Sequence, residues 1–139
     1  MNENWLEIRE YHGEGYRPLI DYGEWRVAIL RYIDELQPDR IDRLERHCET
    51  DEVFILLEGR STLLLGGNGS SLDGLYSQVM EANKLYNVKR NVWHSVLLSQ
   101  DASLLIVENR DTSEGNSQYC LLPPELRQQI IDLGSQEGF

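Results

Sequence analysis

Short runs of β-forming residues follow one another at close spacing along most of this chain, and this pattern constrains the fold more than any other feature. Turns rich in glycine and polar residues separate the runs, as in residues 66–71 (Gly-Gly-Asn-Gly-Ser-Ser). A succession of short strands with such turns predicts an all-β sandwich or barrel. The expected strands are residues 25–33, 41–47, 53–57, 61–65, 75–80, 85–88, 93–98 and 103–108.

One helix is expected at the C-terminal end, over residues 124–133. Proline is tolerated in the first helical turn, and Glu125 suits the positive end of a helix. An apolar stripe follows, and Gly134 is the predicted stop. The stripe consists of Leu126, Ile130, Ile131 and Leu133. Residues 5–11 fit either a short helix or an edge strand.

Length and composition set the class of protein. The 139 residues predict a single domain, residues 1–139, with a hydrophobic core. The net charge of −11 would repel phosphate backbones, so no nucleic-acid partner is expected. No apolar run approaches the length of a membrane span, so no membrane partner is expected. The N-terminus lacks the pattern of a signal peptide, and we therefore expect a cytoplasmic location.

Chemistry-bearing side chains gather on two of the expected strands. Side chains alternate across a strand, so Arg43, Glu45 and His47 share one face. A face of this composition suits a polar cavity better than a core, and the turn after His47 can bring Glu52 beside it. On a later strand, His94 projects from an otherwise apolar face. These residues therefore predict a polar site inside the barrel.

The same residues carry a resemblance to the cupin superfamily, over roughly residues 43–109. The spacings His47-x4-Glu52 and Glu52-x6-Gly59 match the second histidine, the glutamate and the final glycine of the first cupin motif. His94 takes the histidine position of the second motif. Residues 91–95 also look like the ureidoglycolate lyase branch of this superfamily, although Asn91 stands where that branch has glycine. Other departures are Glu45 in the first histidine position, Lys89 in the place of proline and Leu98 in the place of asparagine.

The resemblance implies a fold and a cofactor. The fold would be an all-β cupin-type double-stranded β-helix, a jelly-roll barrel, with core motifs over about residues 41–109 and a C-terminal helix. The cofactor would be a divalent metal ion (Fe, Mn, Zn or Ni), because two imidazoles with one or two carboxylates suit such ions. The implied metal ligands are His47, Glu52, His94 and Glu45.

The first functional hypothesis is a metal-dependent enzyme acting on a small polar or anionic organic molecule. Lyase, isomerase and dioxygenase chemistries all occur on the implied fold. Glu45 would be a fourth ligand or a general base, and Arg43 would bind an anionic group of the substrate. The alternatives are a non-catalytic module that binds or senses a small ligand, and a degenerate, metal-free cupin with a filled barrel.

A homodimer is also expected. The outer faces of a small barrel need cover, and the strands carry Trp25, Tyr32 and Trp93. Dimers are frequent among cupins, and two-fold symmetry is the default arrangement.

Overall fold

The computed structural model describes residue 2 and residues 4–139 of the chain. Within these residues lie ten strands, two short 3-10 helices and one α-helix. The strands are β1 (Gly15–Tyr22), β2 (Trp25–Arg31), β3 (Arg43–His47), β4 (Glu52–Glu58), β5 (Ser61–Leu65), β6 (Tyr76–Val79), β7 (Tyr86–Val88), β8 (His94–Leu98), β9 (Ser103–Asn109) and β10 (Ser117–Leu121). The 3-10 helices are η1 (Asp34–Leu36) and η2 (Glu114–Asn116), and the α-helix is α1 (Pro124–Glu137).

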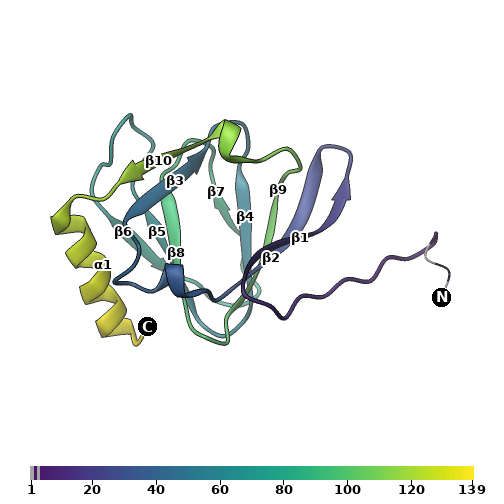
Figure 1. Cartoon of the computed structure of the whole chain (residues 1–139), viewed down its shortest axis with the longest axis horizontal. Coiled ribbons are helices and arrows are strands. Elements are labelled where there is room, and N and C mark those ends of the chain that lie inside the picture. The colour runs from purple at the N-terminus through teal and green to yellow at the C-terminus, as the bar shows by residue number, and fades with distance from the viewer. Residues whose placement is uncertain (1, 3) are drawn as a thin grey trace.

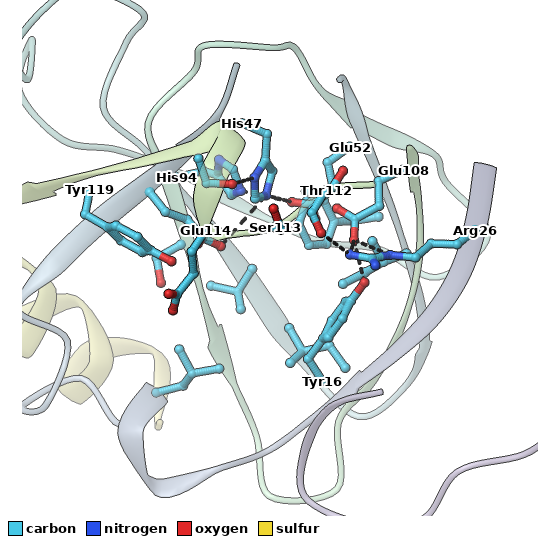
Figure 2. A pocket seen from close by; sticks show the side chains of 18 residues that line it. Tyr16, Arg26, His47, Glu52, His94, Glu108, Thr112, Ser113, Glu114 and Tyr119 are labelled. Carbon is cyan, nitrogen blue, oxygen red and sulfur yellow. Dashed lines mark hydrogen bonds and ion pairs between the residues drawn. The ribbon is translucent and has the colours of Figure 1, made fainter. Parts of the chain in front are cut away.

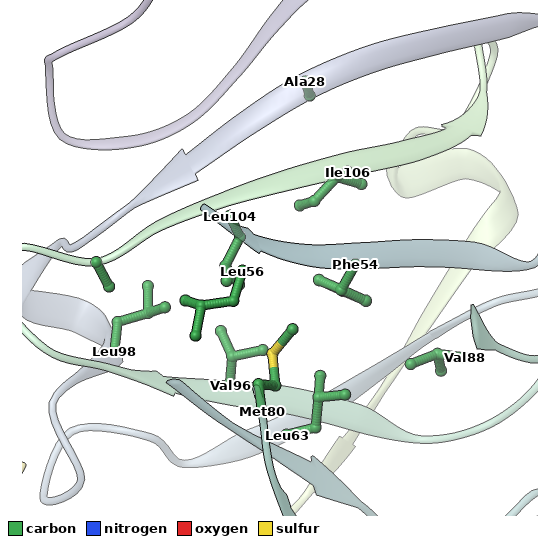
Figure 3. Packing of buried hydrophobic residues seen from close by; sticks show 11 residues of the cluster. Ala28, Phe54, Leu56, Leu63, Met80, Val88, Val96, Leu98, Leu104 and Ile106 are labelled. Carbon is green, nitrogen blue, oxygen red and sulfur yellow. The ribbon is translucent and has the colours of Figure 1, made fainter. Parts of the chain in front are cut away.

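The strands form two antiparallel sheets that enclose the main core. The first sheet has the order β1-β2-β9-β4-β7 and the second has the order β10-β3-β8-β5-β6. Because strands alternate their side chains, each sheet turns one apolar face toward the other. Figure 3 shows the buried side chains between them. They are Ala28, Phe54, Leu56, Leu63, Met80, Val88, Val96, Leu98, Ala102, Leu104 and Ile106. The predicted all-β architecture with one C-terminal helix is confirmed.

A second apolar cluster lies on the outer face of the second sheet, where α1 packs (Figure 1). Trp93 was expected to help form an outer face that a dimer covers, but it is buried in this outer cluster instead. Its indole Nε1 donates a hydrogen bond to the carbonyl of Gly69 at 3.0 Å. The Arg46 guanidinium lies 4.2 Å from the ring centroid and covers it. Trp93 is therefore not part of an exposed surface.

The helix α1 continues past Gly134, the predicted stop, to Glu137. Gly138 ends it in the left-handed conformation, with φ 77°. Gly134 instead permits a close approach, because a Cβ at this position would lie 2.4 Å from Cγ of Pro38. Among the described residues, no helix is both long enough and apolar enough to cross a membrane.

Two strands were not predicted, and both are edge strands. β1 contains Pro18, which demotes a strand in a sequence pattern, and its pairing with β2 shifts in register between Pro18 and Ile20. β10 alternates polar and apolar residues too weakly to be recognised. Residues 5–11 form neither the helix nor the strand considered for them, and Figure 1 shows this segment running away from the sheets.

Candidate metal centre

A cavity of about 350 Å³ lies between the two sheets and is lined by residues from both. This volume falls in the range of small-molecule sites. One side of the cavity is apolar and includes Leu30, Leu36, Phe54, Val96 and Ile106. The rest is polar, and Figure 2 shows its titratable side chains directed toward one another.

His47, at the end of β3, reaches this cavity with its ring held from behind. Its Nδ1 lies 2.8 Å from the Ser117 hydroxyl on β10, the strand that pairs with β3. Its Nε2 is buried, has no hydrogen-bond partner in the described part of the chain, and lies 3.4 Å from Oε1 of Glu52. The imidazole is therefore fixed on one side and free to bind a ligand or an ion on the other.

His94, the first residue of β8, is held in the same manner. Its Nδ1 donates to the carbonyl of Val92 at 2.9 Å, and its Nε2 lies 2.9 Å from Oε1 of Glu52. The turn before it contains Asn91 with φ 68°, a left-handed conformation that asparagine tolerates better than most residues. This accounts for Asn91 in a position where the resembling motif has glycine. The Asn91 amide donates to the carbonyl of His47 at 2.8 Å, which ties the two histidine segments together.

Glu52, at the start of β4, lies at the centre of the site and is buried. Its burial would raise its pKa, but the close imidazoles of His47 and His94 outweigh burial, and the pKa of Glu52 is lowered. Burial likewise disfavours the charged imidazoles, but the close Glu52 carboxylate raises the pKa of both His47 and His94. The three groups thus stabilise one another in their charged forms.

A second polar group adjoins Glu52 and was missed in the sequence. Glu108 on β9 accepts hydrogen bonds on Oε1 from Tyr16 and from Arg26, whose Nη2 lies 2.9 Å away. Arg26 also donates to the backbone carbonyls of Arg110 and Thr112, at 3.1 and 2.9 Å. Burial and the neighbouring Glu52 carboxylate raise the pKa of Glu108 to about 7. Burial and Glu108 also raise the pKa of the Tyr16 hydroxyl.

The sequence did contain a signal for Glu108. Leu104, Ile106 and Glu108 alternate along β9 and are all buried, so the carboxylate continues an apolar face. This is the same anomaly that drew attention to His94. Tyr16 had no such signal, because it lies on the unpredicted edge strand β1.

The remaining two predicted site residues lie nearer the surface. Glu45 lines the cavity, but its side chain is 40% exposed, and its Oε1 lies 3.9 Å from Nε2 of His47. Arg43 was expected in the same cavity but lies outside it, where its Nε pairs with Asp42 at 2.9 Å. Arg43 begins β3 and lines an adjoining cavity, which shares Glu45 and His94 with the first.

The donor set fits a divalent cation. Because Nδ1 of His94 donates to a carbonyl, the Nε2 of a neutral ring directs its lone pair at the Glu52 carboxylate. Only a proton or a cation makes that contact favourable. The buried, unpartnered Nε2 of His47 is a further donor atom for such an ion. Among the described residues there are two groups whose potential ligand atoms all lie within 4.8 Å of one another inside the group. One consists of Glu45, His47 and His94, and the other of His47, Glu52 and Glu108.

Solved structures with the same architecture decide the fold. A cupin-2 domain protein from Shewanella frigidimarina superposes with a TM-score of 0.50 at 18% identity, covering 72% of this chain and 85% of its own. The chain has the cupin fold. Pac13, a protein described as a unique nucleoside dehydratase, has the same fold with a TM-score of 0.55 at 9% identity, covering 83% of this chain and 86% of its own. A Streptomyces Pac13 variant of this cupin fold was solved with uridine.

The Fe(II) form of HppE shares the cupin fold with a TM-score of 0.53 at 14% identity, over 67% of this chain and 48% of HppE. No protein-family profile and no curated protein sequence matches the chain. The solved structures thus confirm the predicted cupin fold. The narrower resemblance to the ureidoglycolate lyase branch stays a prediction.

Proposed function

We propose that the chain is a divalent-metal-dependent enzyme that acts on a small polar organic molecule. The observation that carries this proposal is the approach of two imidazole Nε2 atoms to one buried carboxylate oxygen, with His47 at 3.4 Å and His94 at 2.9 Å from Glu52. Both rings are held through Nδ1, as is usual for histidines that bind metals. The Fe(II) form of HppE, which has the same fold, supports the proposal by analogy.

In this proposal, His47, Glu52 and His94 hold the ion. Fe, Mn, Zn and Ni all suit imidazole and carboxylate donors. A bound divalent ion would polarise a carbonyl or hydroxyl oxygen of the substrate, or activate water. The apolar side of the cavity excludes water around the ligand, which strengthens electrostatic interactions there.

We propose that the substrate is a neutral, hydroxyl-bearing molecule. Among the described residues that line the cavity, Arg26 is the only lysine or arginine, and it already pairs with Glu108 and two carbonyls. Arg43, the first candidate for binding an anionic group, lines the adjoining cavity rather than this one, and it already pairs with Asp42. The uridine in the Pac13 variant is a molecule of the proposed kind, since it is uncharged and rich in hydroxyls.

Glu45 is the proposed general base. Its half-exposed carboxylate lies at the cavity wall beside His47, so it reaches both the ligand and solvent. It would accept a proton from the substrate and release it to water. Proton transfer of this kind belongs to isomerase and lyase reactions, which we favour over oxidation.

Elemental analysis of the purified protein, followed by calorimetry with Mn²⁺, Fe²⁺, Ni²⁺ and Zn²⁺, tests the metal. We expect one ion per chain at saturation. The metal-loaded protein is then assayed against ureido compounds, keto acids, sugars, sugar acids and nucleosides, and turnover of an uncharged member is expected.

The outcomes separate the competing functions. Absence of binding by all four ions would refute metal dependence. Metal binding with ligand affinity but without turnover would favour a sensor or binding module over an enzyme. Glu45→Gln should retain the metal and lose turnover, which distinguishes a base from a ligand.

A further inference from the structure

We propose that Glu108 is a metal ligand alongside His47, Glu52 and His94, and that it takes the place the resembling motif would give to Glu45. This inference rests on the proposed function, because it concerns the same ion. It is carried by the position, the bonding and the surroundings of the Glu108 carboxylate.

The position follows from the strand register. β4 and β9 are antiparallel neighbours, and Val53 pairs with Val107. Glu52 precedes Val53 and Glu108 follows Val107, so the two glutamates are cross-strand neighbours. Potential ligand atoms of His47, Glu52 and Glu108 all lie within 4.8 Å of one another. An ion bound by the first two is thus within reach of the third.

The two oxygens of Glu108 have different surroundings. Oε1 accepts hydrogen bonds from Tyr16 and Arg26, which fix the orientation of the carboxylate. Oε2 is buried and has no hydrogen-bond partner among the described residues, and the whole side chain is only 2% exposed. Carboxylates that bind metals are normally hydrogen-bonded through their other oxygen. Glu108 has this arrangement, with one oxygen anchored and the other free.

The charges of Glu52 and Glu108 also favour a metal ion between them. Glu52 and Glu108 are two buried carboxylates side by side, and their charged forms repel strongly unless a proton or a cation lies between them. Arg26 compensates Glu108 from the far side, through Oε1. A divalent ion between the two carboxylates would compensate both from the near side.

Glu45 is a weaker candidate by the same criteria. Its side chain is 40% exposed, and its oxygen is 3.9 Å from His47 Nε2. Its carboxylate can be solvated by water and does not need an ion. The pair Glu108 and Glu45 therefore provides a matched comparison within one site.

The test is the Mn²⁺ and Zn²⁺ affinity of Glu108→Gln and Glu45→Gln, measured by calorimetry beside the unaltered protein. Glutamine at position 108 keeps an oxygen that can accept from Tyr16 and Arg26, but replaces the free oxygen with a non-ligating amide. Loss of an outer partner of a metal ligand typically costs about 10–100-fold in affinity, so loss of a ligand should cost at least about 100-fold. We expect that loss for Glu108→Gln and a change below about 10-fold for Glu45→Gln.

A Co²⁺-loaded sample gives a second readout, because its visible absorption depends on coordination number and geometry. The spectrum should change in Glu108→Gln and stay the same in Glu45→Gln. If Glu108→Gln does not fold, Tyr16→Phe replaces it, since loss of the bond to Oε1 should shift the spectrum of a coordinated Glu108. An unchanged affinity for Glu108→Gln, or an unchanged spectrum for the variant that folds, would overturn this inference alone. Absence of metal binding by the unaltered protein would overturn the proposed function as well.

Discussion

Nε2 of His94 lies 2.9 Å from Oε1 of Glu52, while Nδ1 of the same ring donates to the carbonyl of Val92. Without a metal, this contact requires a proton on Nε2, so the ring must be an imidazolium. In the metal-free protein this contact therefore depends on a proton that a divalent ion would displace.

We expect the metal-free protein to lose stability as the pH rises. The pKa values of His47 and His94 are raised above 6.5, so their contribution is fully present below that pH and is lost as the pH rises through their folded pKa values. Glu108, with its pKa raised to about 7, acts in the same direction between pH 4.5 and 7. Glu52 acts oppositely, but only as the pH falls below 4.5, because its pKa is lowered.

Urea denaturation of chelator-treated protein between about pH 6 and pH 8.5 measures this effect. The free energy of unfolding should fall over that range. With saturating metal it should not fall, because the ion needs deprotonated ligands. A flat or rising curve for the chelator-treated protein would contradict the prediction.

Replacement of either site histidine by alanine should abolish metal binding. His47→Ala and His94→Ala each remove an imidazole nitrogen from the proposed ligand set. The third histidine, His12, is exposed on the N-terminal segment and pairs with Glu10, so His12→Ala is the matched control. Calorimetry should show unaltered binding for the control. Equal binding by all three variants would place the metal elsewhere.

Gly134→Ala should destabilise the protein even though it lies in a helix. Alanine in a helix is favoured over glycine by about 1 kcal/mol. Here, however, the new Cβ would lie 2.4 Å from Cγ and 2.7 Å from Cβ of Pro38, whose ring cannot swing aside. Overpacking of this kind costs about 1–3 kcal/mol, so we expect a net loss and a lower melting temperature.

The double variant Pro38→Ala with Gly134→Ala should recover part of that loss, as thermal denaturation of Gly134→Ala, Pro38→Ala and the double variant would show. A Gly134→Ala protein more stable than the parent would mean that α1 does not pack closely on Pro38.

The homodimer stays a prediction, with a different surface from the one first considered. Trp93 is buried, but Tyr22 and Trp25 adjoin each other on the β1–β2 hairpin, with ring centroids 6.1 Å apart, and both are exposed. We expect light scattering at high micromolar concentration to give the mass of two chains. Trp25→Glu should lower that mass, while Leu85→Glu, at another exposed apolar residue, should not. A monomer mass for the parent protein would refute the dimer.

Local sequence patterns were sufficient to predict most strands and the inner cluster of the site. Alternation placed Glu45 and His47 on one face, and the spacing to Glu52 follows from a tight turn between neighbouring strands. The same alternation could not place Arg43 relative to the cavity, because parity gives the face of a strand but not the end at which a cavity lies.

The second polar group depended on information that no single segment holds. Glu108 meets Glu52 because β4 and β9 pair in one register, and Arg26 meets Glu108 because β2 pairs with the other side of β9. Such registers are set by the packing of distant strands. Gly134 is a helical example of the same difficulty. A glycine at this position fits the end of a helix, and its role in packing becomes visible only from the position of Pro38.

The hydrogen bond from the Asn91 amide to the carbonyl of His47 joins the turn before one histidine to the strand end that carries the other. The two imidazoles are therefore held in place by backbone structure before any ion arrives. A chain built in this way does not rely on metal to reach its native state, unlike a zinc finger. Removal of the metal by a chelator should leave the protein folded. Binding of the ion should be fast, reversible and accompanied by little change in circular dichroism.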